Sequence, residues 1–209
     1  MTDDRIRRVQ KRLLFTYIAL LLICLAGLWW LYRQLTEHAQ VGRSGLTGTV
    51  YARLPEFVLT ERSGRPLGLR DLSGKVWIAD FIFTSCPGPC PRMSASMAAL
   101  QKELGDAPDL RFVSISVDPD TDTPEVLAGY ANRYGARPDR WFFLTGSKQD
   151  IHTLAKDGFL VGGIENVMEH STRFILVDRT GGIRGYYDSQ DQEAVAALRA
   201  DTLNLLRSG

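Results

Sequence analysis

The sequence predicts an α/β fold, a mixed β-sheet with helices on both faces, preceded by one N-terminal transmembrane helix. Two observations predict the sheet. Short runs of β-branched and aromatic residues alternate with helix-period segments, and the last two runs are joined by a turn-like segment instead of a helix. A third observation, a long uncharged stretch near the N-terminus, predicts the membrane helix. Alternation favours parallel crossovers and the late hairpin adds antiparallel strands, so the sheet is expected to be mixed.

The membrane helix is predicted at residues 13–32, where no charged side chain interrupts twenty positions. A helix of this length spans roughly 30 Å, the thickness of the hydrocarbon core of a bilayer. Trp29, Trp30 and Tyr32 lie at its distal end, as interfacial aromatic residues do. A cleaved signal peptide normally has a shorter apolar core, so we expect an uncleaved anchor. Cys24 lies inside this stretch and is expected to act as a small apolar residue.

Basic residues predict the orientation of the chain. Five precede the apolar stretch within residues 1–12, whereas only Arg33 and Arg43 follow it in the next stretch of chain. Basic flanks stay in the cytoplasm, so residues 1–12 are expected to be cytoplasmic. Residues 33–50 are expected to be a linker. Residues 51–209 are then an extracytoplasmic domain, on the periplasmic or intermembrane-space side.

Patterns within residues 51–209 predict the order of elements. The expected strands are residues 76–83, 111–117, 141–144, 173–177 and 183–187. The expected helices are residues 91–104, 124–134, a short one around 151–155, and 191–206. Thr123 followed by Pro124 is a typical helix start. A thioredoxin-like fold has this order of strands and helices.

Composition limits the classes of partner. Apolar residues make up 44% of the chain and charged residues 23%, which is typical of a globular protein and not of a disordered one. The net charge of +1 gives no reason to expect a nucleic-acid partner.

The chemistry is expected at Cys86 and Cys90, in a loop that joins a buried strand to a helix beginning near Pro91. Backbone N–H groups at a helix N-terminus stabilise thiolate, so this position predicts a lowered cysteine pKa. Pro87 and Pro89 restrict the loop, which lowers the ordering cost of binding a metal. The CxxxC spacing by itself is a weak motif. It also fits a redox-active pair able to form a disulfide, or two structural cysteines.

His170 is the candidate third ligand, because it lies just before the predicted strand at residues 173–177. In a thioredoxin-like sheet that loop approaches the cysteine loop. Two thiolates and one imidazole suit copper, as Cu(I) or Cu(II), whereas zinc usually takes a fourth ligand. The remaining histidines, His38 and His152, are expected to be incidental.

Other side chains near the site are expected to have structural roles. Met93 is expected to pack within its helix, and the sequence leaves the role of Met168 open. Asp118, Asp120 and Asp122 are expected to serve a turn and a helix start, because the segment lacks the EF-hand pattern of a calcium loop.

Three longer segments follow the expected N-terminal anchor in this order: FTSCPGPCP, SVDPDTDTPEVLAGYANRYG and EHSTRFILVDRTGGIRGYYD. On these segments the chain resembles the SCO/SenC family of copper-binding assembly factors for cytochrome c oxidase. The resemblance implies a membrane-anchored copper metallochaperone with Cys86, Cys90 and His170 as ligands. It also implies delivery of copper to the binuclear centre of an oxidase subunit, or reduction of that subunit's cysteines. Many family members carry an acidic residue between the two cysteines, whereas this chain has Pro87-Gly88-Pro89. That difference puts the copper affinity in doubt without removing a ligand.

Three alternatives to the metallochaperone remain. A thiol–disulfide oxidoreductase acting on an extracytoplasmic client needs Cys86 and Cys90 but not His170. A thiol peroxidase needs one reactive cysteine with an arginine nearby, such as Arg92 or Arg173. A purely structural domain needs none of these residues.

Overall fold

The computed structural model describes residues 20–29, 49–104, 106–161 and 172–208. The chain divides into two compact units, Met1–Val41 and Gly42–Gly209. In the first unit residues 20–29 are helical and exposed. None of the helices in the described ranges has both the length and the apolarity that crossing a bilayer requires. The rest of the expected membrane helix, residues 13–19 and 30–32, lies outside the described residues.

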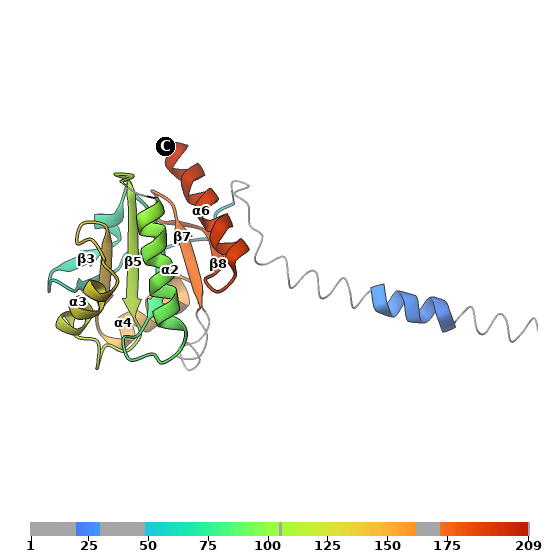
Figure 1. Ribbon diagram of the computed structural model, residues 1–209, viewed down its shortest axis with the longest axis horizontal. Helices are drawn as coiled ribbons and strands as arrows, with labels where there is room; N and C mark the ends of the chain where they lie inside the picture. The colour runs from blue at the N-terminus through green and yellow to red at the C-terminus, as the bar shows by residue number, and fades with distance from the viewer. Residues whose placement is uncertain (1–19, 30–48, 105, 162–171, 209) are drawn as a thin grey trace, which may run out of the picture. The chain divides into compact units, whose positions relative to one another are not determined.

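The second unit is built on one eight-stranded mixed sheet with the strand order β1-β8-β7-β4-β5-β6-β2-β3 (Figure 1). The strands are β1 Ala52–Arg53, β2 Val58–Glu61, β3 Pro66–Gly68, β4 Val76–Ile82, β5 Leu110–Ser116, β6 Trp141–Thr145, β7 Arg173–Val177 and β8 Gly182–Asp188. The central strands β4, β5 and β6 are parallel. The remaining pairs are antiparallel, including β7 beside β4.

Helices cover both faces of the sheet. They are α2 Pro89–Glu103, α3 Pro124–Arg133, α4 Lys148–Thr153 and α6 Gln192–Arg207, with a 3₁₀ turn η2 Leu69–Leu72 and a π-helical turn η3 Leu154–Gly158. Apolar residues of α2, α3 and α6 form one core with alternate residues of β4, among them Ile78 and Ile82. The other residues of β4, among them Trp77 and Phe81, pack against α4 and η3. The strand is buried along its whole length because each of its faces meets a helical layer.

The central elements agree with the sequence predictions, whereas the first three strands were not predicted. All five expected strands and all four expected helices are present, with ends shifted by a few residues. Strands β1, β2 and β3 are two to four residues long and lie toward the sheet edges. Runs this short carry too little periodicity to be recognised. Strand β1 pairs with the distant strand β8 and β2 with the distant strand β6, whereas β3 pairs with its neighbour β2.

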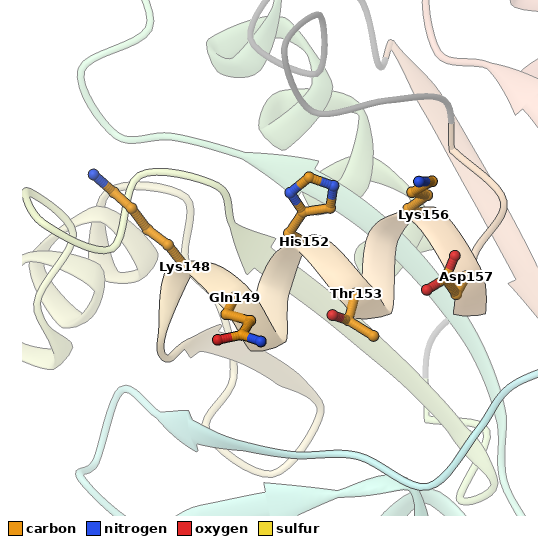
Figure 2. Close-up of a pocket in the computed structure, with 6 residues that line it drawn as sticks. All are labelled: Lys148, Gln149, His152, Thr153, Lys156 and Asp157. Carbon is orange, nitrogen blue, oxygen red and sulfur yellow. The ribbon is translucent and has the colours of Figure 1, made fainter.

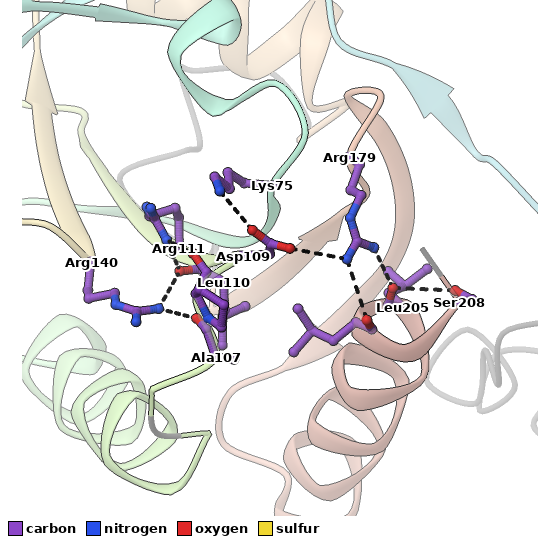
Figure 3. Close-up of polar contacts among 11 residues, drawn as sticks. Lys75, Ala107, Asp109, Leu110, Arg111, Arg140, Arg179, Leu205 and Ser208 are labelled. Atoms are coloured by element: carbon purple, nitrogen blue, oxygen red, sulfur yellow. Dashed lines mark hydrogen bonds and ion pairs between the residues drawn. The ribbon is translucent and has the colours of Figure 1, made fainter.

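An arginine joins the last helix to the end of the sheet where β4 begins (Figure 3). Arg179 donates to the carbonyl oxygen of Leu205 at 2.7 Å, near the C-terminus of α6. Asp109, just before β5, pairs with Arg179 at 3.7 Å and with Lys75 at 2.8 Å. A cation that hydrogen-bonds the last carbonyl groups of a helix satisfies unpaired acceptors and interacts favourably with the helix dipole.

We expect Arg179→Ala to lower the free energy of unfolding by about 1 to 2 kcal/mol, because it leaves carbonyl groups of α6 without their partner. Urea unfolding followed by far-UV circular dichroism measures this change. The matched control is Arg199→Ala on the same helix, whose pair with Glu103 at 3.2 Å is half exposed. An exposed pair contributes little, so equal losses in the two variants would contradict the capping role.

Candidate metal centre

Cys86 and Cys90 lie at the junction of β4 and α2. The strand ends at Ile82 and the helix begins at Pro89, which places Cys86 in the loop and Cys90 in the first helical turn. Both are free thiols, and their exposed fractions are only 7% and 4%. The N–H of Cys86 donates to the carbonyl oxygen of Phe83 at 3.2 Å, which closes a turn at the start of the loop. The chain therefore holds two soft donor atoms together in a site shielded from water.

The two thiols interact directly, and burial governs the protonation of Cys90. Burial raises the pKa of the Cys90 thiol to about 12. The backbone of Phe83 lowers this pKa, whereas the Cys86 thiol and Asp80 raise it further. The predicted lowering of the cysteine pKa by the helix N-terminus is therefore wrong for Cys90. Proline at positions 89 and 91 also removes two N–H donors from the first turn, which weakens the stabilisation of an anion there.

His170 lies outside the described residues, but the strand that follows it is described. β7 begins at Arg173 and runs antiparallel to β4, with Ala79 opposite Ile175. The start of β7 therefore lies at the same end of the sheet as the end of β4, where the cysteine loop begins. His170 precedes Arg173 by three residues, which span roughly 10 Å at most when extended.

A buried carboxyl group that was not predicted from the sequence lies in β4, the strand that leads into the cysteine loop. Asp80 in β4 is completely buried, and its Oδ1 accepts a hydrogen bond from Ser114 Oγ at 2.6 Å. Ser114 Oγ accepts in turn from Trp141 Nε1 at 2.9 Å. Oδ2 of Asp80 has no hydrogen-bond partner among the described residues. Burial raises the pKa of Asp80 to about 7, and the Ser114 hydrogen bond opposes the shift. A lone carboxylate inside an otherwise apolar strand was the available signal.

The acidic turn after β5, residues 118–122, has carboxylates that contact other segments of the protein. Asp120 pairs with Lys148 of α4, and Asp122 accepts hydrogen bonds from Thr84 and Ser116. Within the part of the chain that the structure describes, no three His, Cys, Asp or Glu side chains are grouped so that they could hold a metal ion. The structural role expected for this turn agrees with these contacts.

The other candidates lie at the surface, in the core or outside the described residues. His152 lines an open surface pocket of about 450 Å³, and the described residues that line it all belong to α4 and η3 (Figure 2). Lys148, His152 and Lys156 project from one side of this helical segment. Met93 is 1% exposed and packs in the core beneath α2, as expected, whereas Met168 lies outside the described residues.

Comparison with known proteins identifies the family. The family model described as SCO1/SenC matches residues 47–204, which include the whole sheet and all the helices on its faces except the last three residues of α6. The chain belongs to the SCO1/SenC family. As a SCO1/SenC protein it shares the thioredoxin-like fold of its relatives, which agrees with the fold predicted from its sequence.

Three relatives of this SCO1/SenC chain illustrate the similarity. The SCO1 protein homolog of Bacillus subtilis is 38% identical over 139 residues, covering 63% of this chain and 72% of that protein. BsSco is a member of the Sco family of cytochrome c oxidase assembly proteins with an identified disulfide switch. Its structure is 31% identical with a TM-score of 0.68, covering 77% of this chain and 98% of that chain. The crystal structure of Arabidopsis thaliana ScoI with copper bound is 26% identical with a TM-score of 0.63, covering 76% and 100%.

The raised pKa of Asp80 predicts a pH-dependent stability. Between the unfolded-state pKa near 3.8 and the folded-state value of about 7, the folded protein binds more protons than the unfolded chain. The free energy of unfolding contributed by Asp80 therefore falls as pH rises through this window, and the loss is complete above the folded-state pKa. Asparagine has no charge to bury, so Asp80→Asn should escape this loss. We expect the free energy of unfolding of the variant, relative to that of the native protein, to be higher at pH 8 than at pH 5 by on the order of 2 kcal/mol.

Urea unfolding of both proteins at pH 5 and pH 8 measures this difference. Cys90 titrates far above the window, so its thiol does not contribute to the comparison. Parallel stability profiles for the two proteins would contradict a raised pKa at Asp80.

Proposed function

We propose that this chain is a membrane-anchored copper metallochaperone that binds one copper ion through Cys86, Cys90 and His170. Its cargo is destined for the binuclear copper centre of a cytochrome c oxidase subunit. The observation that carries the proposal is the pair of buried free thiols at the junction of β4 and α2. Family membership supports it, as does the copper bound to the related Arabidopsis ScoI.

Two thiolates and one imidazole fit copper because sulfur is a soft ligand and because both sulfurs are buried. Thiolate sulfur favours Cu(I), and two thiolates with one imidazole also hold Cu(II). Copper binding displaces the thiol protons, so the charge of the ion replaces them in a site where a free thiolate is unfavourable. Burial of both sulfurs also keeps water away from the bound ion. A chaperone needs such a site to hold a redox-active metal until it meets its client.

His170 is proposed as the third ligand because of where its strand begins. Arg173, three positions after His170 in the sequence, lies at the end of the sheet from which the cysteine loop departs. An imidazole would complete the set without adding a charge, because it ligates as a neutral group.

We also propose that residues 13–32 anchor the chain in the membrane. Residues 1–12 would then lie in the cytoplasm, residues 33–50 would form a linker, and residues 51–209 would form the copper-binding domain outside it. Support comes from the length of the uncharged stretch and from the basic residues that precede it. This arrangement would bring the domain to clients on the extracytoplasmic side.

Thiol–disulfide exchange is the second candidate function, and the contact between the two thiols favours it. A cysteine pair close enough to hydrogen-bond can be oxidised to a disulfide with limited movement of the loop. The related BsSco has a disulfide switch. The two functions are compatible, since the reduced pair binds copper and the oxidised pair does not.

Anaerobic titration of the reduced full chain with Cu(I), followed by metal analysis, tests the proposal. We expect one copper per chain, and at least a hundredfold loss of affinity in Cys86→Ser and Cys90→Ser because each removes a thiolate ligand. His170→Ala should weaken copper binding while retaining disulfide exchange with a dithiol reagent, because exchange needs only the cysteines.

His152→Ala is the matched control, since it removes an imidazole from a surface pocket whose described lining residues include neither cysteine. Unchanged copper affinity in His170→Ala, or an equal loss in His152→Ala, would reject His170 as a ligand. If the native chain binds no copper but catalyses disulfide exchange, the second function stands alone.

A further inference from the structure

Asp122 is a buried carboxylate that hydrogen-bonds directly to the loop carrying the cysteines. Its side chain is completely buried, and no ion pair links it to any residue in the described ranges. Its Oδ1 accepts from Thr84 Oγ1 at 2.5 Å, and its Oδ2 accepts from the Thr84 N–H at 3.1 Å and from Ser116 Oγ at 2.6 Å. Burying a carboxylate is costly unless hydrogen bonds compensate, and these bonds supply that compensation.

The three residues belong to three segments that meet at one end of the sheet. Thr84 lies two residues after the end of β4, and Ser116 is the last residue of β5. Asp122 belongs to the turn before α3, where its own N–H donates to the Asp118 carbonyl oxygen at 2.8 Å. The carboxylate therefore ties the start of the cysteine loop to a turn that is itself fixed.

Thr84, which Asp122 contacts, lies in a short turn that is connected to both cysteines. Thr84 is the second residue of the turn closed by the hydrogen bond from the Cys86 N–H to the Phe83 carbonyl oxygen. Phe83, the first residue of this turn, also lowers the pKa of the Cys90 thiol through its backbone, so it lies near Cys90 as well. Asp122 holds both the N–H and the hydroxyl of Thr84, so it restricts the backbone between the strand and Cys86.

We propose that Asp122 is a positioning residue for the cysteine pair: acting through Thr84, it fixes the turn that holds the Cys86 and Cys90 sulfurs close together. The inference rests on the proposed function for its copper readout, but its redox readout needs no copper. Loosening the turn lowers the effective concentration of one thiol at the other, which disfavours the disulfide and also weakens a bidentate grip on a metal.

The two hydroxyl contacts of Asp122 provide a matched comparison. Thr84→Val and Ser116→Ala each remove one hydroxyl donor from the same buried carboxylate. Among the described residues, the one other hydrogen bond of Ser116 Oγ comes from the Asp118 N–H at 3.1 Å, in the turn after β5 and not in the cysteine loop. Thr84→Ser keeps the hydroxyl and serves as the rescue variant. Replacing Asp122 itself would leave several buried donors unpaired and disturb folding, so it is not the test variant.

The experiment measures the dithiol–disulfide equilibrium of the full chain in glutathione redox buffers. Cys86 and Cys90 lose two electrons and two protons as the S–S bond forms, and one oxidised glutathione takes them up to give two reduced molecules. Cu(I) affinity, by competition with a chromophoric chelator, and the midpoint of thermal unfolding are measured on the same proteins.

We expect Thr84→Val to disfavour the disulfide about tenfold, raising the reduction potential by about 30 mV, and to weaken Cu(I) binding by a similar factor. Thr84→Ser should restore both, and Ser116→Ala should change neither by more than about twofold while lowering the unfolding midpoint. If Thr84→Val and Ser116→Ala shift the potential equally, or Thr84→Val leaves it unchanged, the positioning role is overturned. Absence of copper binding in the native chain would overturn the proposed function alone, because the redox comparison still decides the role of Asp122.

Discussion

The parallel pairing of β4 with β5 is the constraint on which the candidate site depends. The two strands pair over seven residues, from Val76 opposite Leu110 to Ile82 opposite Ser116, so both end at the same edge of the sheet. The cysteine loop follows one strand and the acidic turn follows the other. Thr84 and Asp122, 38 positions apart in the sequence, therefore come into hydrogen-bond contact. A shift of this register would separate the loop from its support.

Burial gives the site its chemical character. The thiols of Cys86 and Cys90 and the carboxyl group of Asp80 are all shielded from water beneath the helical layer of α2 and α3. Shielding disfavours an isolated negative charge, which explains the raised pKa values of Cys90 and Asp80. A bound cation reverses this preference, because its charge balances the thiolates. A raised pKa lowers the fraction of Cys90 present as thiolate, which slows any reaction that uses this thiolate as a nucleophile, the peroxidase alternative and thiol–disulfide exchange alike.

The sequence predicted the central fold and the position of the cysteines because each rests on a local pattern. Strand β4 has a run of apolar residues, α3 has Thr123 and Pro124 at its start, and the cysteines lie between a strand and a helix. Strands β1 to β3 could not be predicted, since β1 and β2 pair with β8 and β6, which are distant in sequence, and the local β2–β3 hairpin is too short to show a pattern. The pKa of Cys90 was predicted with the wrong sign because helix-terminus reasoning is local, whereas desolvation depends on the packed core. The contact between Asp122 and Thr84 could not be predicted for the same reason, because it joins residues that come together only in the folded sheet.

X-ray absorption spectroscopy of the Cu(I)-loaded full chain tests the copper assignment most directly, because it identifies the atoms bound to the metal. The account predicts two sulfur ligands and one imidazole, with the imidazole scattering lost in His170→Ala and kept in His152→Ala. An unchanged imidazole signal in His170→Ala, or a native site with fewer than two sulfurs, would contradict it.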